Sequence, residues 1–110
     1  MFKLLAVIVI EVIFEAIADA RDEFIDLVHR TMAASQQEQG CVLYRFTADL
    51  ENPSQLILTE LWENEDALRA HFGGNAFKSF FAELPSRGRF VSYRAWQGPL
   101  VPYVPPNQAA

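Results

Sequence analysis

The chain has 110 residues, of which 51% are hydrophobic, so it is long enough for one hydrophobic core and too short for two independently stable domains. Its 14 acidic and 9 basic side chains leave a net charge of −5, and no segment gathers Lys or Arg into the basic stripe that binds a phosphate backbone. We therefore expect no nucleic-acid partner. Cys41 is the single cysteine, which excludes an intramolecular disulfide, and no Cys/His cluster has metal-ligand spacing. A reducing, cytoplasmic compartment and no bound metal are the expectation.

The N-terminal residues 2–14 are mostly Val, Ile, Leu and Phe, which favours a strand covered on both faces. The apolar run also resembles a short signal peptide, with residues 16–18 imitating a cleavage site. Glu11 and Glu15 oppose that interpretation, because a signal peptide stays uncharged there. The run is also shorter than the roughly 20 residues needed to cross a bilayer. We predict a central strand and no membrane association.

A helix is expected next, with Asp19 as its N-cap and an apolar stripe from Phe24 to Thr31. Gly40 ends the polar run that follows this helix. Residues 41–48 alternate apolar and polar side chains, and a second strand-like segment covers residues 56–62. The polar, Pro-containing loop between these segments predicts an antiparallel hairpin.

A second helix is predicted to start at Asn64, to break at Gly73-Gly74 and to restart at Asn75. A fourth strand is expected over residues 90–97. The prolines that follow oppose regular pairing in a sheet, so we predict a domain over residues 1–98 and an extended arm over residues 99–110.

The resulting order, β-α-β-β-α-β, predicts an α+β, ferredoxin-like fold with a four-stranded antiparallel sheet and the helices on one face. Alternate strand residues on both faces are apolar or aromatic, so a monomer would expose an apolar sheet face. The simplest partner for that face is a second copy, which predicts a homodimer formed through the sheets.

One segment carries an ordered motif: a glycine before the second strand, Glu-x-Trp at the end of the third, an acidic helix start, an Ala-Leu pair, a histidine on that helix, and an aromatic residue after the helix break. The residues are Gly40, Glu60, Trp62, Glu65, Asp66, Ala67, Leu68, His71 and Phe77. This set resembles the core of the antibiotic biosynthesis monooxygenase family. The resemblance implies a dimeric α+β barrel that oxygenates electron-rich phenols or quinols with O2, without flavin, haem or metal. The chain also has no dinucleotide fingerprint and no P-loop.

The predicted catalytic set is His71, Trp62 and Tyr44. His71 is the best general acid/base, because histidine titrates near neutrality, and its alternative is a packed histidine with one hydrogen bond. Trp62 would stack on a planar substrate or belong to the core, and Tyr44 would orient a substrate hydroxyl or be a barrel residue. The other histidine, His29, is expected in solvent.

The predicted substrate-binding set is Glu60, Phe72, Phe77 and Arg45. Glu60 has a favoured alternative, a cross-strand ion pair with Arg45 or Arg94. Phe77 follows the glycine pair, a plausible hinge, and is expected to be core or a pocket lid.

The resemblance implies a cofactor-independent monooxygenase acting on a small quinol or polyketide-like phenol, with the candidate residues above at its site. Two alternatives stay open: an isomerase or lyase of the same superfamily acting on a small oxo compound, and a dimeric module that binds an aromatic ligand without turnover. Haem degradation, known in some relatives, is disfavoured, since residues 2–15 contain no Asn and Phe81 falls near the position of the iron ligand.

Overall fold

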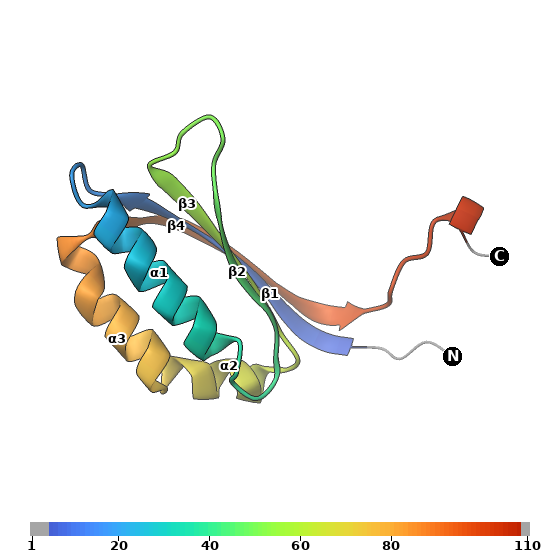
Figure 1. Ribbon diagram of the computed structural model, residues 1–110. Helices are drawn as coiled ribbons and strands as arrows, with labels where there is room; N and C mark the ends of the chain where they lie inside the picture. Colours follow the sequence, from blue (N-terminus) through green and yellow to red (C-terminus); the bar gives the residue numbers. More distant parts are fainter. Residues whose placement is uncertain (1–4, 109–110) are drawn as a thin grey trace.

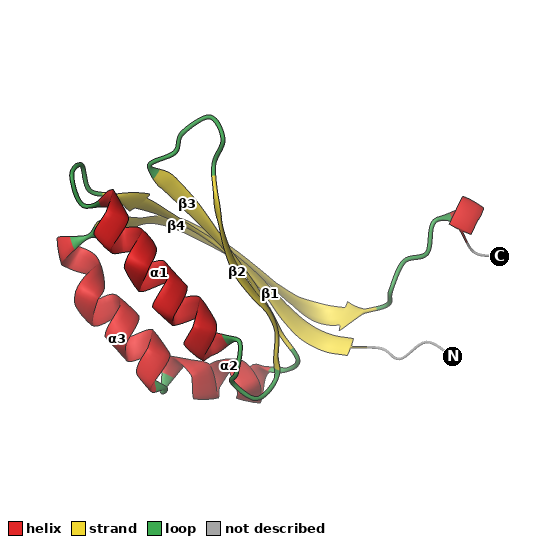
Figure 2. Cartoon of the chain, viewed as in Figure 1, coloured by secondary structure: helices red, strands yellow, loops and turns green. Residues whose placement is uncertain are grey.

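The computed structural model of the chain describes residues 5–108. Four antiparallel strands form one sheet in the order β2-β3-β1-β4, and three helices lie on one of its faces (Figures 1 and 2). The strands are β1 (Leu5–Ala16), β2 (Cys41–Ala48), β3 (Gln55–Trp62) and β4 (Gly88–Leu100), and the helices are α1 (Arg21–Ser35), α2 (Glu65–Phe72) and α3 (Asn75–Glu83). Short 3-10 turns cover Leu84–Ser86 and Pro106–Gln108. The predicted ferredoxin-like α+β fold is confirmed, with the second helix divided in two at the glycine pair.

The core lies between the sheet and the helices. Along β1, Ile8, Ile10, Val12 and Phe14 are buried toward the helices, because successive side chains of a strand point to opposite faces. Phe14 is at the centre of an aromatic cluster, with ring centroids within 6.4 Å of those of Phe24, Phe46, Phe80, Phe81 and Phe90.

The two predicted helix caps have different outcomes. Asn64 caps α2 as expected, since its Oδ1 accepts a hydrogen bond from the Ala67 N–H at 2.9 Å. The prediction for Asp19 is wrong: α1 begins at Arg21 after Ala20, which makes no side-chain cap bond, and Asp19 takes a left-handed conformation (φ 72°) in the preceding turn. Aspartate tolerates that conformation better than most residues, so it serves the turn instead of the helix.

β4 is longer than predicted. It continues to Leu100, and Pro99 lies opposite Ala6 in the register with β1. The predicted end at residue 97 was wrong because β4 is an edge strand, where proline costs no hydrogen bond on the side that faces away from the sheet. Residues 101–107 then form an exposed arm that leaves the body of the molecule (Figure 1). The predicted start of the first strand, residues 2–4, lies outside the described residues.

The turn between α1 and β2 packs directly on α2. Gly40 has φ +82°, and a Cβ placed on it would lie 2.4 Å from the Cβ of Ala67, so only glycine fits there. The amide of Glu63 donates to the Gly40 carbonyl at 2.8 Å and fixes the same approach. This contact brings the turn residues against the histidine-bearing helix. Within residues 5–108, no helix has both the length and the apolar character required to span a bilayer.

Candidate functional site

A cavity of about 140 Å³ lies between the inner face of the sheet and the helices α2 and α3. Its volume is close to the roughly 150 Å³ of an apolar cavity that binds benzene. Exposed rings mark its open side, between these helices and β4: Phe72, Phe81, Phe90 and Tyr93. Most of the remaining wall is aromatic or aliphatic, from Phe14, Phe77, Phe80, Ile10, Val12 and Leu58. A planar apolar molecule fits this lining.

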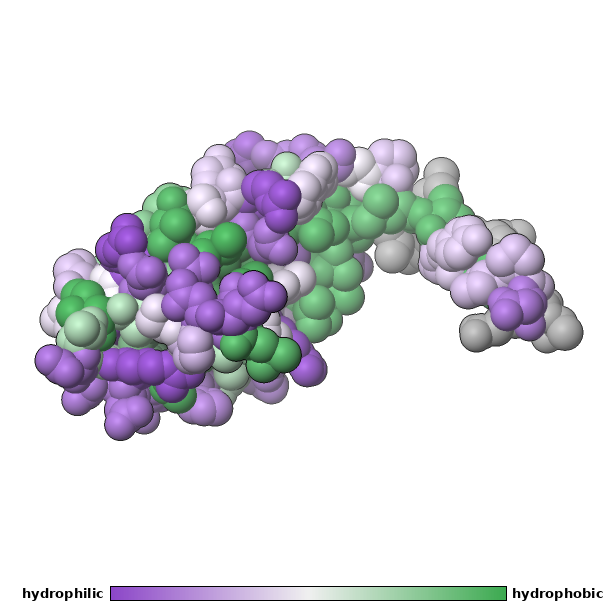
Figure 3. All heavy atoms as spheres, turned by 90° about the horizontal axis from the view of Figure 1, so that it is seen from above, coloured by the Kyte–Doolittle hydropathy of each residue, from purple (hydrophilic) through white to green (hydrophobic). Residues whose placement is uncertain are grey.

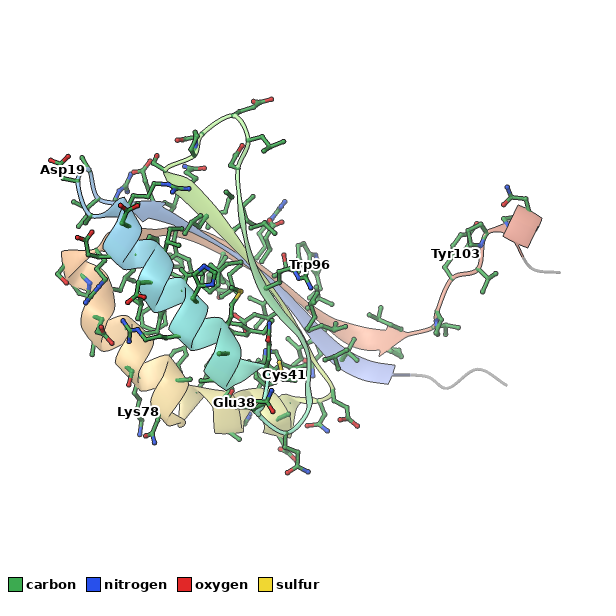
Figure 4. All side chains as sticks on the ribbon, in the orientation of Figure 1. Asp19, Glu38, Cys41, Lys78, Trp96 and Tyr103 are labelled. Carbon is green, nitrogen blue, oxygen red and sulfur yellow. The ribbon has the colours of Figure 1, made fainter. Side chains whose placement is uncertain are left out.

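The inner end of the cavity is polar. Glu60 from β3, His71 from α2 and Tyr44 from β2 line it, and all three are buried. Nε2 of His71 lies 4.0 Å from Oε1 of Glu60, and Nδ1 on the other side of the ring lies 2.5 Å from Oε1 of Glu38. His71 is therefore held between two carboxyl groups. Glu38 belongs to the turn after α1, which Figure 4 shows beside α2.

Trp62 supports this polar end from behind. Its Nε1–H donates to Oε1 of Glu60 at 2.8 Å, and its ring lies against His71 with centroids 4.6 Å apart and planes inclined by 34°. Trp62 is fully buried and does not line the cavity. The predicted role as a stacking wall therefore does not match its position, because the strand ends beneath the helix and the histidine covers the indole.

Burial governs the electrostatics of the site. It raises the pKa of Glu60, an effect that the Trp62 hydrogen bond and the nearby His71 only partly offset. Burial, together with the Glu60 charge, also raises the pKa of Tyr44. Tyr44 is therefore a neutral hydroxyl at neutral pH. A carboxyl group with a raised pKa next to a histidine is an arrangement that can both take and give a proton.

The structure brings five of the predicted site residues together at the cavity, namely Tyr44, Glu60, His71, Phe72 and Phe77. Arg45 is not among them. Tyr44 lies opposite Glu60 and faces the helices, so the next residue, Arg45, points to the outer face of the sheet. The prediction of Arg45 as a substrate contact is therefore at odds with its position in this chain.

The favoured alternative for Glu60, a cross-strand ion pair, is wrong. Arg94 lies on the outer face and pairs with Glu11, with Nη2 and Oε1 2.5 Å apart. Glu60 instead faces the core and is bonded to Trp62. Glu60 and the arginines are separated because alternate residues of a strand point to opposite faces of the sheet. The sequence alone did not show which face Glu60 occupies.

Two groups of site residues were missed from the sequence. Glu38 lies within a polar run of the sequence, and the useful signal is Gly40, whose left-handed turn folds that run onto α2. The sequence marks Phe90 and Tyr93 of β4 only as strand residues. A bulge in the pairing of β1 with β4 separates these two by three positions while both line the cavity, which defeats simple alternation. Among residues 5–108, no group of three or more His, Cys, Asp or Glu side chains is placed to hold a metal ion.

Comparison with known proteins agrees with this architecture. Residues 7–83 match the family model described as antibiotic biosynthesis monooxygenase. The chain belongs to this family. Among solved structures, a candidate antibiotic biosynthesis monooxygenase from Deinococcus radiodurans is 21% identical, with a TM-score of 0.80 over 88% of this chain and 97% of that one. A variant of SnoaB, a cofactor-independent oxygenase from Streptomyces nogalater, is 16% identical, with a TM-score of 0.74 over 84% of this chain and 93% of that one.

A curated relative, an uncharacterized protein from Synechocystis sp., is 33% identical over 67 residues. The match covers 61% of this chain, and the chain spans only 46% of that relative's length. At these identities the solved structures establish that the chain shares the fold of the antibiotic biosynthesis monooxygenase family. The substrate of this member is inferred from the chemistry of its site.

Proposed function

We propose that this protein is a cofactor-independent monooxygenase that oxygenates a small, electron-rich aromatic compound, such as a quinol or a polyketide-like phenol. The observation that supports this most directly is an aromatic cavity of about 140 Å³ with a buried carboxyl-histidine pair at its inner end. An apolar site excludes water and accepts both a planar ring and O2, while the polar end supplies a proton acceptor.

The proposed reaction needs no external reductant. The site removes the hydroxyl proton of the substrate, and the resulting anion transfers one electron to O2. The substrate radical and superoxide then combine to form a C–O bond at a ring carbon, and the peroxide regains the proton. Loss of water, with the hydrogen of that carbon and the distal oxygen with its proton, leaves a second carbonyl. The balance is HO–Ar–H plus O2 to O=Ar=O plus H2O.

The test is oxygen uptake by metal-stripped protein with hydroquinones, naphthols and an anthrone-like phenol. We expect uptake above autoxidation that falls about 100-fold or more in His71→Ala, the usual range for a lost general acid/base. His29→Ala is the matched control, since His29 is exposed on α1 and does not line the cavity. Uptake at the autoxidation rate with every substrate would refute the proposal.

A second function is favoured by one arrangement, the Glu60 carboxyl group 4.0 Å from Nε2 of His71 at the wall of the cavity. Such a pair can move a proton between two carbons of a small oxo compound, which is the chemistry of an isomerase. This function would exchange substrate hydrogen with solvent deuterium without consuming O2. Binding of an aromatic compound with neither uptake nor exchange would instead indicate a binding module.

We further propose that a second copy covers the outer face of the sheet, and that the dimer acts in the cytoplasm, where a single thiol stays reduced. The outer face presents apolar side chains from all four strands, including Val9, Leu43, Leu61 and Trp96. Figure 3 shows hydrophobic residues in a continuous stretch between the helical part and the C-terminal arm. Sedimentation equilibrium is the direct test, with Trp96→Glu expected to shift the protein toward monomer.

A further inference from the structure

Three polar side chains, those of Glu60, His71 and Glu38, meet at the inner end of the cavity and differ in their surroundings. Glu60 and His71 both line the cavity, and Glu38 lies on the far side of the imidazole, nearest to solvent. The side chains of Glu60, His71 and Glu38 are 8%, 2% and 26% exposed, respectively. A histidine enclosed in this way has each ring nitrogen assigned to a different carboxyl group.

We propose that Glu60 is the catalytic residue that touches the substrate hydroxyl, and that Glu38 is a positioning residue that keeps the His71 proton on Nδ1 so that Nε2 exchanges a proton with Glu60. This inference rests on the proposed oxygenase function and names the group within the site that contacts the substrate.

The position of Glu38 supports its role as a positioning residue for His71. Its Oε1 lies 2.5 Å from Nδ1 of His71, and a Cβ placed on Gly74 would be 3.3 Å from its Oε2. The glycine at the break between α2 and α3 thus leaves room for the carboxylate. A carboxylate on Nδ1 fixes the tautomer and stabilises the imidazolium that forms when Nε2 takes a proton.

The contacts of Glu60 support its role as the residue that touches the substrate hydroxyl. Within the described residues, both polar neighbours of Glu60 lie at Oε1: the Trp62 N–H donates to it at 2.8 Å, and Nε2 of His71 lies 4.0 Å from it. This leaves Oε2 as the oxygen for a substrate hydroxyl. The 4.0 Å separation is longer than a hydrogen bond, and such catalytic contacts commonly shorten when a substrate fills the site.

The proton balance within one turnover is closed. The substrate O–H bond breaks and its proton passes to Glu60, and from Glu60 to Nε2 of His71, giving an imidazolium between two carboxylates. After O2 has added, the same proton returns through Glu60 to the peroxide. Two other titratable groups lie near this set. Tyr44 on β2, beside His71, stays neutral because burial raises its pKa. Cys41 at the start of β2 is close enough to feel the charges of Glu38 and Glu60, and burial raises its pKa so that the thiol stays protonated.

The first experiment needs no activity. Long-range 1H–15N spectra of the histidine rings at neutral pH report which nitrogen carries the proton. We expect His71 to be protonated on Nδ1 in the wild type and in Glu38→Gln, whose amide oxygen still accepts the bond, and to change to the Nε2–H form in Glu38→Ala. His29 is the internal control and should not change. An Nε2–H form of His71 in the wild type would overturn the role of Glu38.

The second experiment separates Glu60 from His71. Oxygen uptake by Glu60→Gln should lose about 100-fold in kcat with a KM within a few-fold of the wild type, because the amide keeps the shape and the Trp62 contact but takes no proton. Glu63→Gln, which changes an exposed carboxyl just beyond the end of β3, is the matched control. Full kcat in Glu60→Gln together with loss in His71→Ala would show that His71 touches the substrate and would overturn the proposal.

A binding measurement keeps the inference testable if no substrate is oxygenated. The affinity for 1-naphthol should rise about threefold to tenfold between pH 5 and pH 8 in the wild type, as the Glu60 carboxylate forms and accepts the naphthol hydroxyl. The rise should be absent in Glu60→Gln. The same rise in both proteins would overturn the role of Glu60, whereas absent oxygen uptake with a normal result here would refute only the oxygenase function.

Discussion

Carboxylates on the two faces of the sheet have opposite surroundings. On the outer face, Glu11 and Glu15 of β1 lie opposite Arg94 and Arg89 of β4 and form ion pairs with them. On the inner face, Glu60 lies between Ile10 and Tyr44, so neither of its cross-strand neighbours is an arginine. The same side chain is thus paired and partly exposed on one face and buried with a raised pKa on the other. A buried acid that has a histidine in place of an arginine beside it opposes stability, which is typical of a functional position.

The largest expected difference between the faces is in packing. Phe14→Ala should lower the free energy of unfolding by about 3 to 5 kcal/mol, because it removes the ring at the centre of the aromatic cluster and leaves a cavity. Urea unfolding followed by circular dichroism measures this loss.

The matched variant is Ile13→Ala, one residue earlier and on the outer face, where the side chain is only half-buried. At low protein concentration its loss should stay well below that of Phe14→Ala. Equal losses at the two positions would contradict the assignment of the core to the helical face. A loss at Ile13 that grows with protein concentration would instead support the dimer.

The second difference is in ionisation. Because burial raises the folded-state pKa of Glu60, the folded protein binds a proton at this site more tightly than the unfolded chain does. The contribution of the group to stability is complete below the unfolded pKa of about 4.5 and is lost as the pH rises through the folded pKa. Glu60→Gln cannot ionise, so it should gain stability relative to the wild type over this window.

Urea unfolding of both proteins from pH 4 to pH 8 tests this expectation. The gain should be near zero at pH 4, should grow as the wild-type carboxyl is forced to ionise in its buried position, and should level off above the folded pKa. Its size at the plateau, at about 1.4 kcal/mol for a tenfold difference in proton affinity, measures how much more tightly the folded protein holds this proton. A stability difference that does not change with pH would show that Glu60 ionises in the folded protein as it does in the unfolded chain.

Features of this fold that depend on local sequence could be predicted, and features that depend on which face a residue occupies could not. Element order, the hairpin and the Gly73-Gly74 break depend on local patterns, and the structure confirms them. His71 and Glu60 could be chosen because a motif and a strand position marked them. The partners of Glu60 could not, because they depend on which face of β3 the helices cover and on its pairing with β1 and β2.

Glu38 and Tyr93 show a second limit. Glu38 reaches His71 only because a left-handed glycine folds the turn onto α2, a contact across 33 residues of chain. Tyr93 reaches the cavity only because a bulge changes the register of β4. Both features are tertiary, and neither leaves a periodic pattern in the sequence.

The smallest expected effect concerns the outer-face charges. Glu11→Gln should change the free energy of unfolding by less than about 1 kcal/mol, since the Glu11 and Arg94 side chains are 32% and 67% exposed and solvent screens their pair. A double-mutant cycle with Arg94→Gln, run at low and high salt, isolates the coupling between them. A coupling that is small and disappears at high salt would show that the outer-face pair is solvated, in contrast to the buried carboxyl group of Glu60. A coupling of several kcal/mol that persists in salt would mean that this face is desolvated in solution, as it would be beneath a second copy, and the contrast between the two faces would then hold only for the monomer.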